Sequence, residues 1–175
     1  MTTILKISIN SSKLKTKAEV IKGEGHTDVV LPGLIAAFDF IFPKEKWLVS
    51  YQDLISKSGN AKENIDKFYN ELSDTYGIDI YPNMDRLYSM SCVKNIGRSL
   101  IRQERVDEAI ELYQYWTELY PNSHLAHSYL GRAQKIINDF RAAKKSYEKA
   151  VVLVKSDYLQ VYIIEYQKVL EEINK

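Results

Sequence analysis

The sequence has little cysteine, almost no net charge and no long hydrophobic run. Its single cysteine, Cys92, excludes an intramolecular disulfide, so nothing points to an oxidising compartment. The 24 basic and 23 acidic side chains leave a net charge of +1, which gives no reason to expect a nucleic-acid partner. Hydrophobic residues still make up 45% of the chain, which is ordinary for a globular protein and argues against disorder.

The most apolar stretch, residues 29–42, is interrupted by Pro32, Gly33 and Asp39 and is too short to cross a bilayer. The first residues also lack the apolar centre of a signal peptide. We therefore expect a cytoplasmic protein without a membrane partner. A secreted or periplasmic parent, of which this chain is one part, fits the same residues.

The N-terminal part predicts a strand. Residues 14–22 place Ala18, Val20 and Ile21 among charged side chains, and two glycines then mark a loop. A lone strand cannot satisfy its backbone groups. It therefore either pairs with a neighbour, such as residues 3–9, or leaves an open edge for self-association.

A helix is predicted next, over residues 32–42. Pro32 suits the first turn of a helix, and Pro43 ends it. Asp39 is the one charged residue in between, so almost no polar face remains. Such a helix should be largely buried.

Residues 46–89 read as a helical linker. They contain a short helix over 47–56 and a longer one over 61–76, where apolar residues recur at intervals of three and four. Gly77 is a natural C-terminal cap for the longer helix, because glycine accepts positive φ. Pro82 separates that helix from the next one along the chain.

A repeat with a period of 34 residues then dominates the sequence. Gly97 and Gly131 are 34 apart (131 − 97), and two further small and aromatic positions recur at the same interval. This is the period of the tetratricopeptide repeat, and the residue types resemble the signature of that family. The matching residues are Ile96, Gly97, Leu100, Ala109, Tyr113 and Pro121 in the first repeat, and Leu130, Gly131, Ala143, Tyr147 and Ala150 in the second.

The glycine in each first helix lets the second helix approach closely. The sequence departs from the family where Trp116 replaces a small residue, Gln134 a large apolar one and Lys155 the proline. The register does not extend in either direction, since Glu63 and Glu165 would hold the glycine positions. Flanking helices must therefore complete the stack: residues 61–76 at one end and 157–174 at the other.

Three histidines are the candidates for chemistry. His124 and His127 lie three apart at a helix start but lack further ligands at metal-site spacing, so we expect no metal and no cofactor. His26 lies in a glycine-containing loop between the predicted strand and the predicted buried helix.

The stretch around His26, KGEGHTDVVLPGLIAAFDFIFP, resembles the last strand, histidine loop and last helix of an α/β-hydrolase. The likeness is to esterases of the ferric-siderophore (enterochelin) type, some of which continue into a tetratricopeptide tail. The later segment FYNELSDTYGIDIYPNMDRLYSM fits their order. By this resemblance His26 matches the catalytic base. However, no G-x-S-x-G nucleophile elbow exists in the chain, so we expect no catalysis by this chain alone.

The first helices of such repeats line a concave face, onto which Lys94, Arg98, Arg132 and Lys135 would project. This predicts a basic groove for an acidic peptide or a C-terminal carboxylate. The alternative is a set of solvated basic residues on a short solenoid. The carboxylate-clamp pattern of chaperone-binding repeats also requires asparagine where this chain has Arg98 and Tyr129.

Together these observations predict a mainly α chain of tetratricopeptide hairpins, preceded by a short strand and a buried helix. The predicted division is 1–45 (hydrolase remnant), 46–89 (linker), 90–156 (two repeats) and 157–175 (capping helix). The first hypothesis is the non-catalytic C-terminal segment of an esterase-like hydrolase, whose partner is another polypeptide or the missing hydrolase portion. The second is an independent protein–protein interaction scaffold, and the third is a small active ester hydrolase.

Overall fold

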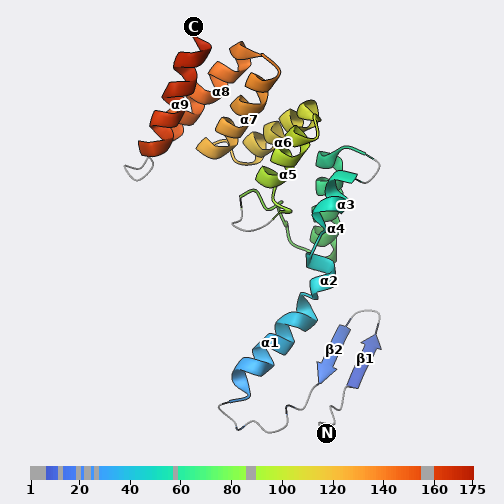
Figure 1. Ribbon diagram of the computed structural model, residues 1–175. Helices are drawn as coiled ribbons and strands as arrows, with labels where there is room; N and C mark the ends of the chain where they lie inside the picture. Colours follow the sequence, from blue (N-terminus) through green and yellow to red (C-terminus); the bar gives the residue numbers. More distant parts are fainter. Residues whose placement is uncertain are drawn as a thin grey trace. The chain divides into compact units, whose positions relative to one another are not determined.

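The computed structural model describes residues 7–11, 14–18, 21, 25, 28–56, 59–85, 90–154 and 160–175. Its contacts form two compact units, Met1–Leu48 and Val49–Lys175, and each is described here by itself (Figure 1). Within the described residues, every helix is too short or too polar to cross a membrane.

The first unit contains a two-stranded antiparallel sheet. Strand β1 (Ile7–Ser11) pairs with β2 (Leu14–Ala18), with Ile7 opposite Ala18. The predicted strand therefore has a neighbour, which begins and ends later than the expected residues 3–9. Helix α1 (Val30–Ile41) comes next with Pro32 in its first turn as predicted, and a single-turn helix α2 (Lys44–Trp47) comes after it.

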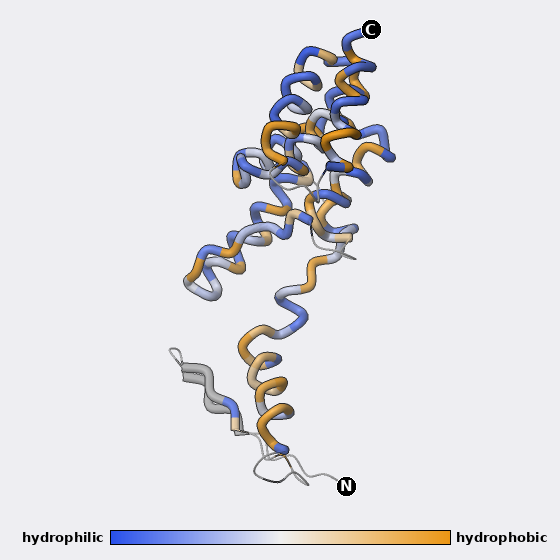
Figure 2. Tube along the Cα trace, turned by 90° about the vertical axis from the view of Figure 1, so that its left-hand side faces the viewer, coloured by the Kyte–Doolittle hydropathy of each residue, from blue (hydrophilic) through white to orange (hydrophobic). Residues whose placement is uncertain are grey.

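The prediction that this first helix is largely buried is wrong. None of the residues of α1 is buried, and the helix appears as an almost continuous apolar segment in Figure 2. A sheet of two short strands is too small to cover an apolar helix of three turns. The sequence pattern correctly predicted an apolar helix, but the described residues of the first unit include no further elements that could cover it.

The 34-residue repeat is present in the backbone of the second unit. Helices α5 (Val93–Arg102) and α6 (Val106–Leu119) form one hairpin, and α7 (His124–Ile136) and α8 (Phe140–Leu153) form the next. Both hairpins turn through a residue in the left-handed region, Glu104 (φ 61°) and Asn138 (φ 62°), which are 34 apart (138 − 104). The second unit therefore has a tetratricopeptide-like helical repeat fold.

The predicted close approach at the repeat glycines is confirmed. A Cβ atom at Gly97 would lie 2.4 Å from Cζ of Tyr113, and one at Gly131 would lie 2.9 Å from Cδ2 of Tyr147. Each first helix thus leaves room, at one residue, for the aromatic ring of the second helix. This contact explains why glycine and tyrosine recur together along the chain.

Helices α3 (Tyr51–Ser56) and α4 (Ala61–Tyr76) stack on the first repeat. Helix α3 contacts α5 and α4 contacts α6, and the buried Leu54, Ile55 and Ile65 belong to the same core as the repeats. Asn60 and Glu63 form a capping box at the start of α4, and Gly77 ends it at φ 66° as predicted. Residues 61–76 thus cover this end of the stack as predicted, while the fourfold domain division stays a prediction.

A charged group fixes α3 and α4 to the first repeat. Arg105 donates to both carboxylate oxygens of Glu108, at 2.6 and 2.8 Å, and to the carbonyl of Ile55 at 2.7 Å. The carboxylate of Glu108 also accepts the backbone N–H of Ala61 at 3.3 Å. The hydrogen bond from Arg105 is the main reason why the pKa of Glu108 is lowered.

The other end of the stack is covered by α9 (Gln160–Ile173), which packs on α8 as the cap prediction expected. Tyr147, Ala150 and Tyr166 form the buried centre of this contact. The unusual Gln134 is also explained, because its side chain accepts a buried hydrogen bond of 2.8 Å from Ser146. Lys155, the third departure from the repeat signature, lies outside the described residues.

Candidate functional site

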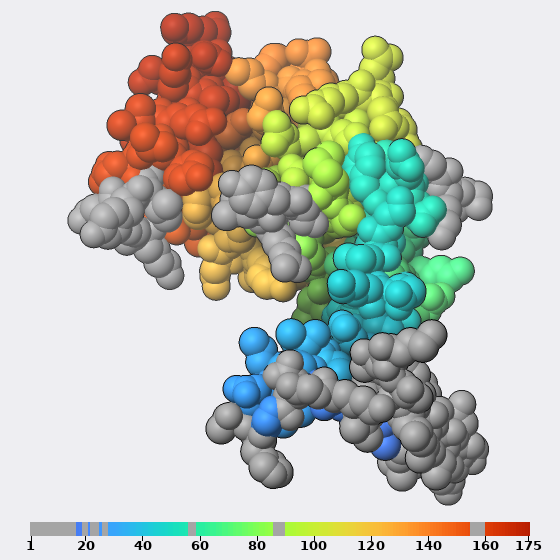
Figure 3. Space-filling model, turned by 60° about the horizontal axis from the view of Figure 1, so that its bottom comes forward, coloured from blue at the N-terminus to red at the C-terminus, as the bar shows by residue number. Residues whose placement is uncertain are grey.

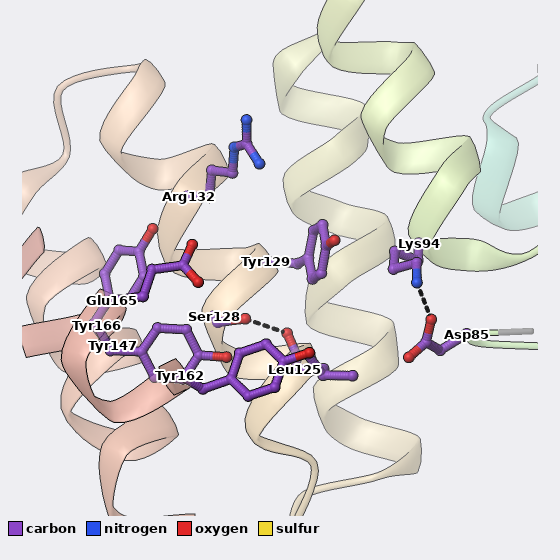
Figure 4. Close-up of a pocket in the computed structure, with 10 residues that line it drawn as sticks. All are labelled: Asp85, Lys94, Leu125, Ser128, Tyr129, Arg132, Tyr147, Tyr162, Glu165 and Tyr166. Atoms are coloured by element: carbon purple, nitrogen blue, oxygen red, sulfur yellow. Dashed lines mark hydrogen bonds and ion pairs between the residues drawn. The ribbon is translucent and has the colours of Figure 1, made fainter. Parts of the chain in front are cut away.

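A cavity of about 150 Å³ lies between the first helices α5 and α7 and the capping helix α9 (Figure 4). We call it the α5–α7–α9 groove. Helix α7 contributes the largest share of its wall, while α5 and α9 provide opposite sides. Its lining residues are Asp85, Lys94, Leu125, Ser128, Tyr129, Arg132, Tyr147, Tyr162, Glu165 and Tyr166.

Aromatic rings form much of the wall. The ring of Tyr129 packs on two buried rings of α6: its centroid lies 5.5 Å from that of Tyr113 and 5.9 Å from that of Trp116. On the other side, Tyr166 lies 5.9 Å from Tyr147 and 6.1 Å from Tyr162, again between centroids. Rings held by neighbouring rings lose little conformational entropy when a ligand packs on them.

The tyrosine hydroxyls remain protonated in this setting. Burial raises the pKa of Tyr166 to about 12, against the opposing effect of its hydrogen bond with Ser128. Burial likewise raises the pKa of Tyr147 to about 12, against the opposing charge of Arg132. Both phenols are therefore neutral near pH 7 and able to donate or accept hydrogen bonds.

The basic side chains around the groove differ in their partners. Lys94 is in an ion pair with Asp85. Partial burial lowers the pKa of Lys94, but the hydrogen bond and charge of Asp85 outweigh this, so the pKa is raised overall. Arg98 and Arg132 are exposed and make no ion pair with any other described residue.

The structure brings some of the predicted site residues together and separates others. Lys94 and Arg132 line the same groove. Arg98 lies one turn beyond Lys94 on α5, and its charge, like that of Arg132, acts on the phenol of Tyr113. Lys135 sits at the end of α7 and bonds to Glu172 of α9 at 2.7 Å. His26 lies outside the described residues, so its predicted role stays untested.

Sequence reasoning missed the aromatic and acidic part of the groove. Tyr129 is one of 13 tyrosines in the chain, an excess that signals an aromatic surface without placing it. Tyr162 and Tyr166 are four residues apart and so share a face of α9. The sequence pattern predicts that this face packs on the last repeat, and it gives no sign that the two rings also line a groove. Glu165 enters the groove from the same helix, whereas in the sequence it stands out merely as an interruption of the repeat register.

His124 joins α7 to the capping helix α9. Its Nδ1 lies 3.2 Å from the hydroxyl of Tyr166, and its ring centroid lies 5.1 Å from that of Tyr162. His127 points elsewhere, with Nε2 2.9 Å from the carbonyl oxygen of Pro121. Burial lowers the pKa of His124, and the charge of Asp85 opposes this more weakly.

This lowered pKa makes the cap sensitive to acid. A histidine that resists protonation in the folded state costs stability once the pH falls below its unfolded pKa of 6.5. We expect thermal unfolding to occur at lower temperature as the pH is reduced from about 7.5 to about 5, with part of the decrease due to His124. His124→Gln should show a smaller decrease over this range. An equal decrease in both proteins would contradict the assignment.

No protein-family model and no curated protein matches the chain. Among solved structures, PcrH from Pseudomonas aeruginosa is 13% identical, with 89% of this chain and 100% of PcrH covered at a TM-score of 0.46. The structure of PcrH in complex with the chaperone binding region of PopD is also 13% identical. It covers 89% of this chain and 97% of that chain at a TM-score of 0.45.

The TPR domain of Sgt2 from Aspergillus fumigatus is 21% identical, with 65% of this chain and 70% of that domain covered at a TM-score of 0.38. At TM-scores below 0.5, these likenesses add nothing to what the helices of this chain show themselves. The resemblance to esterases receives no support from the comparisons. The described residues likewise contain a two-stranded hairpin and an uncovered helix, and no hydrolase sheet.

Proposed function

We propose that the second unit is a peptide-binding module, whose α5–α7–α9 groove takes an extended segment of another polypeptide that carries an acidic group. One observation carries the proposal. Arg98 and Arg132, on the first helices of consecutive repeats, are exposed without an acidic partner among the described residues, whereas Lys94 and Lys135 each have one. The ligand's charge is therefore assigned to the two arginines.

The rest of the groove fits the same kind of ligand. The faces of Tyr129 and Tyr162 offer apolar area beside polar hydroxyls, a combination that binds peptide side chains without demanding one sequence. Glu165 and Asp85 add negative charge at other points of the wall. They favour a ligand in which one acidic group is followed by uncharged residues, rather than a uniformly acidic tail.

The proposal is tested with the full chain and an array of short random peptides. Half carry one fixed Asp or Glu, and half carry Asn or Gln at the same place. We expect binding to the acidic set. The Arg98→Ala/Arg132→Ala variant should bind the selected peptide at least about tenfold more weakly, because a hydrogen bond to a charged group contributes about 1.5–3 kcal/mol.

Arg141→Ala is the matched control. Arg141 is an exposed arginine on α8, the second helix of the same hairpin that carries Arg132. Its removal changes the net charge in the same direction but takes nothing from the groove, so affinity should be retained. Equal binding of both peptide sets, or equal losses in the two kinds of variant, would refute an arginine-based groove.

A further inference from the structure

Helix α1 has two apolar faces with different surroundings. Gly33, Ala36 and Phe40 face the hairpin, where they line a cavity of about 240 Å³ together with Lys17 and Ile21. Leu31, Leu34, Ile35, Phe38 and Phe42 lie on the opposite side of the helix. Their exposed fractions are 67%, 51%, 55%, 60% and 37%, so much of this second face is exposed, with Phe42 also in contact with Phe38 and Trp47. Part of α1 is visible at the surface in Figure 3 (blue).

The spacing of these exposed residues indicates that their partner is another helix. Leu31, Ile35, Phe38 and Phe42 succeed one another at steps of four, three and four residues (35 − 31, 38 − 35, 42 − 38). This is the alternation with which one helix packs along another. The ring of Phe38 already stacks on that of Phe42, with 6.3 Å between centroids, so the row is partly ordered before any partner arrives. We call this row, with Leu34 beside it, the α1 seam.

The α1 seam is large enough for a specific interface. Aromatic side chains bury about 150–250 Å² each, and leucine and isoleucine lie near the lower end of that range. Five of them that are about half exposed would therefore remove roughly 500 Å² from water on each copy. Two copies would bury about 1,000 Å², which reaches the lower limit for a biological interface. Apolar patches of this extent on a soluble protein mark interaction sites.

We propose that two copies of the chain associate through α1, with their seams facing each other across a two-fold axis. A second copy brings the same row of residues, and a row that packs on its own copy satisfies the self-complementarity that a two-fold interface requires. The first unit also gains from such support, because a two-stranded hairpin by itself is marginally stable. Self-association through the N-terminal strand, which the sequence predicted, stays a separate prediction.

Sedimentation velocity of the full chain over a wide concentration range tests the proposal. We expect a concentration-dependent monomer–dimer equilibrium. Ile35→Glu would place two uncompensated carboxylates in the apolar contact and should weaken dimerisation by at least about tenfold. Val152→Glu is the matched control: Val152 is 75% exposed on α8, and the same change there should leave the dimer intact.

A cross-linking experiment tests the geometry without adding charge. Ile35→Cys should form a disulfide between copies under mild oxidation, whereas Val152→Cys should not; the native Cys92 is buried and does not compete. A wild-type chain that stays monomeric, or a dimer that survives Ile35→Glu, would overturn the proposal. Failure here is distinguishable from failure of the peptide groove, because Ile35→Glu should retain peptide affinity.

Discussion

Trp116→Ala is expected to lower the free energy of unfolding of the second unit by about 3–5 kcal/mol, the usual cost of removing a buried aromatic side chain. Trp116 is 2% exposed and contacts Tyr113 and Tyr129, with ring centroids at 6.3 and 5.9 Å. Its loss would leave a cavity between α6 and α7, directly beneath the groove. Tyr129 would lose its support, so peptide affinity should fall as well.

The family pattern predicts the opposite sign for this substitution. A small residue is usual at this position of the repeat, and changes toward a family consensus commonly stabilise a protein. The structure argues otherwise because the neighbouring rings are arranged around the indole. Denaturant unfolding followed by circular dichroism decides between the two. Tyr120→Ala, at a 43% exposed aromatic just after the same helix, should change stability by less than about 1 kcal/mol.

Gly97→Ala is the second substitution with a large expected effect. The new Cβ would lie 2.4 to 2.6 Å from two ring carbons and the hydroxyl oxygen of Tyr113, closer than any real contact. Tyr113 cannot move freely, since it is fully buried and its hydroxyl donates to the carbonyl of Lys94 at 3.1 Å. Overpacking of this kind costs about 1–3 kcal/mol, which should exceed the gain of about 1 kcal/mol from helix propensity.

Two further variants make this prediction specific. Gly33→Ala introduces the same methyl group into α1, where nothing lies within 4 Å, and should leave the unfolding of the second unit unchanged. Gly97→Ala combined with Tyr113→Leu should cost less than the sum of the two single changes, because leucine vacates the space that the methyl group needs. Strictly additive losses would show that the glycine is required for another reason.

The sequence predicted the repeat hairpins well because their signature records direct contacts. Glycine and tyrosine recur at intervals of 34 residues since each glycine accommodates the ring of its own hairpin. Helices α3 and α4 stack on the first repeat without this glycine–tyrosine contact, so the 34-residue period does not extend to them, although helical spacing predicted both helices. Their attachment depends instead on the carboxylate of Glu108 and on Arg105, whose partners lie about 50 residues away in sequence.

The groove was harder to predict because its residues come from separate elements. Helical spacing predicted Lys94 and Arg132 on one face, and both line the groove. It could not show that Asp85, from a loop, pairs with Lys94. Nor could it show that Glu172 of the cap pairs with Lys135. The exposure of α1 was likewise not predictable. A helix that is apolar on all sides is normally buried, and the sequence pattern does not show which other elements pack against it.

The two tryptophans of the chain fall one in each unit. Trp116 is buried against Tyr129, which lines the groove, while Trp47 packs edge-on against Phe42 at the end of the α1 seam, with 5.4 Å between centroids. Intrinsic fluorescence can therefore follow both proposed associations without an added label. In a Trp47→Phe protein, emission should respond to peptide and not to protein concentration, and in a Trp116→Phe protein the dependence should be reversed.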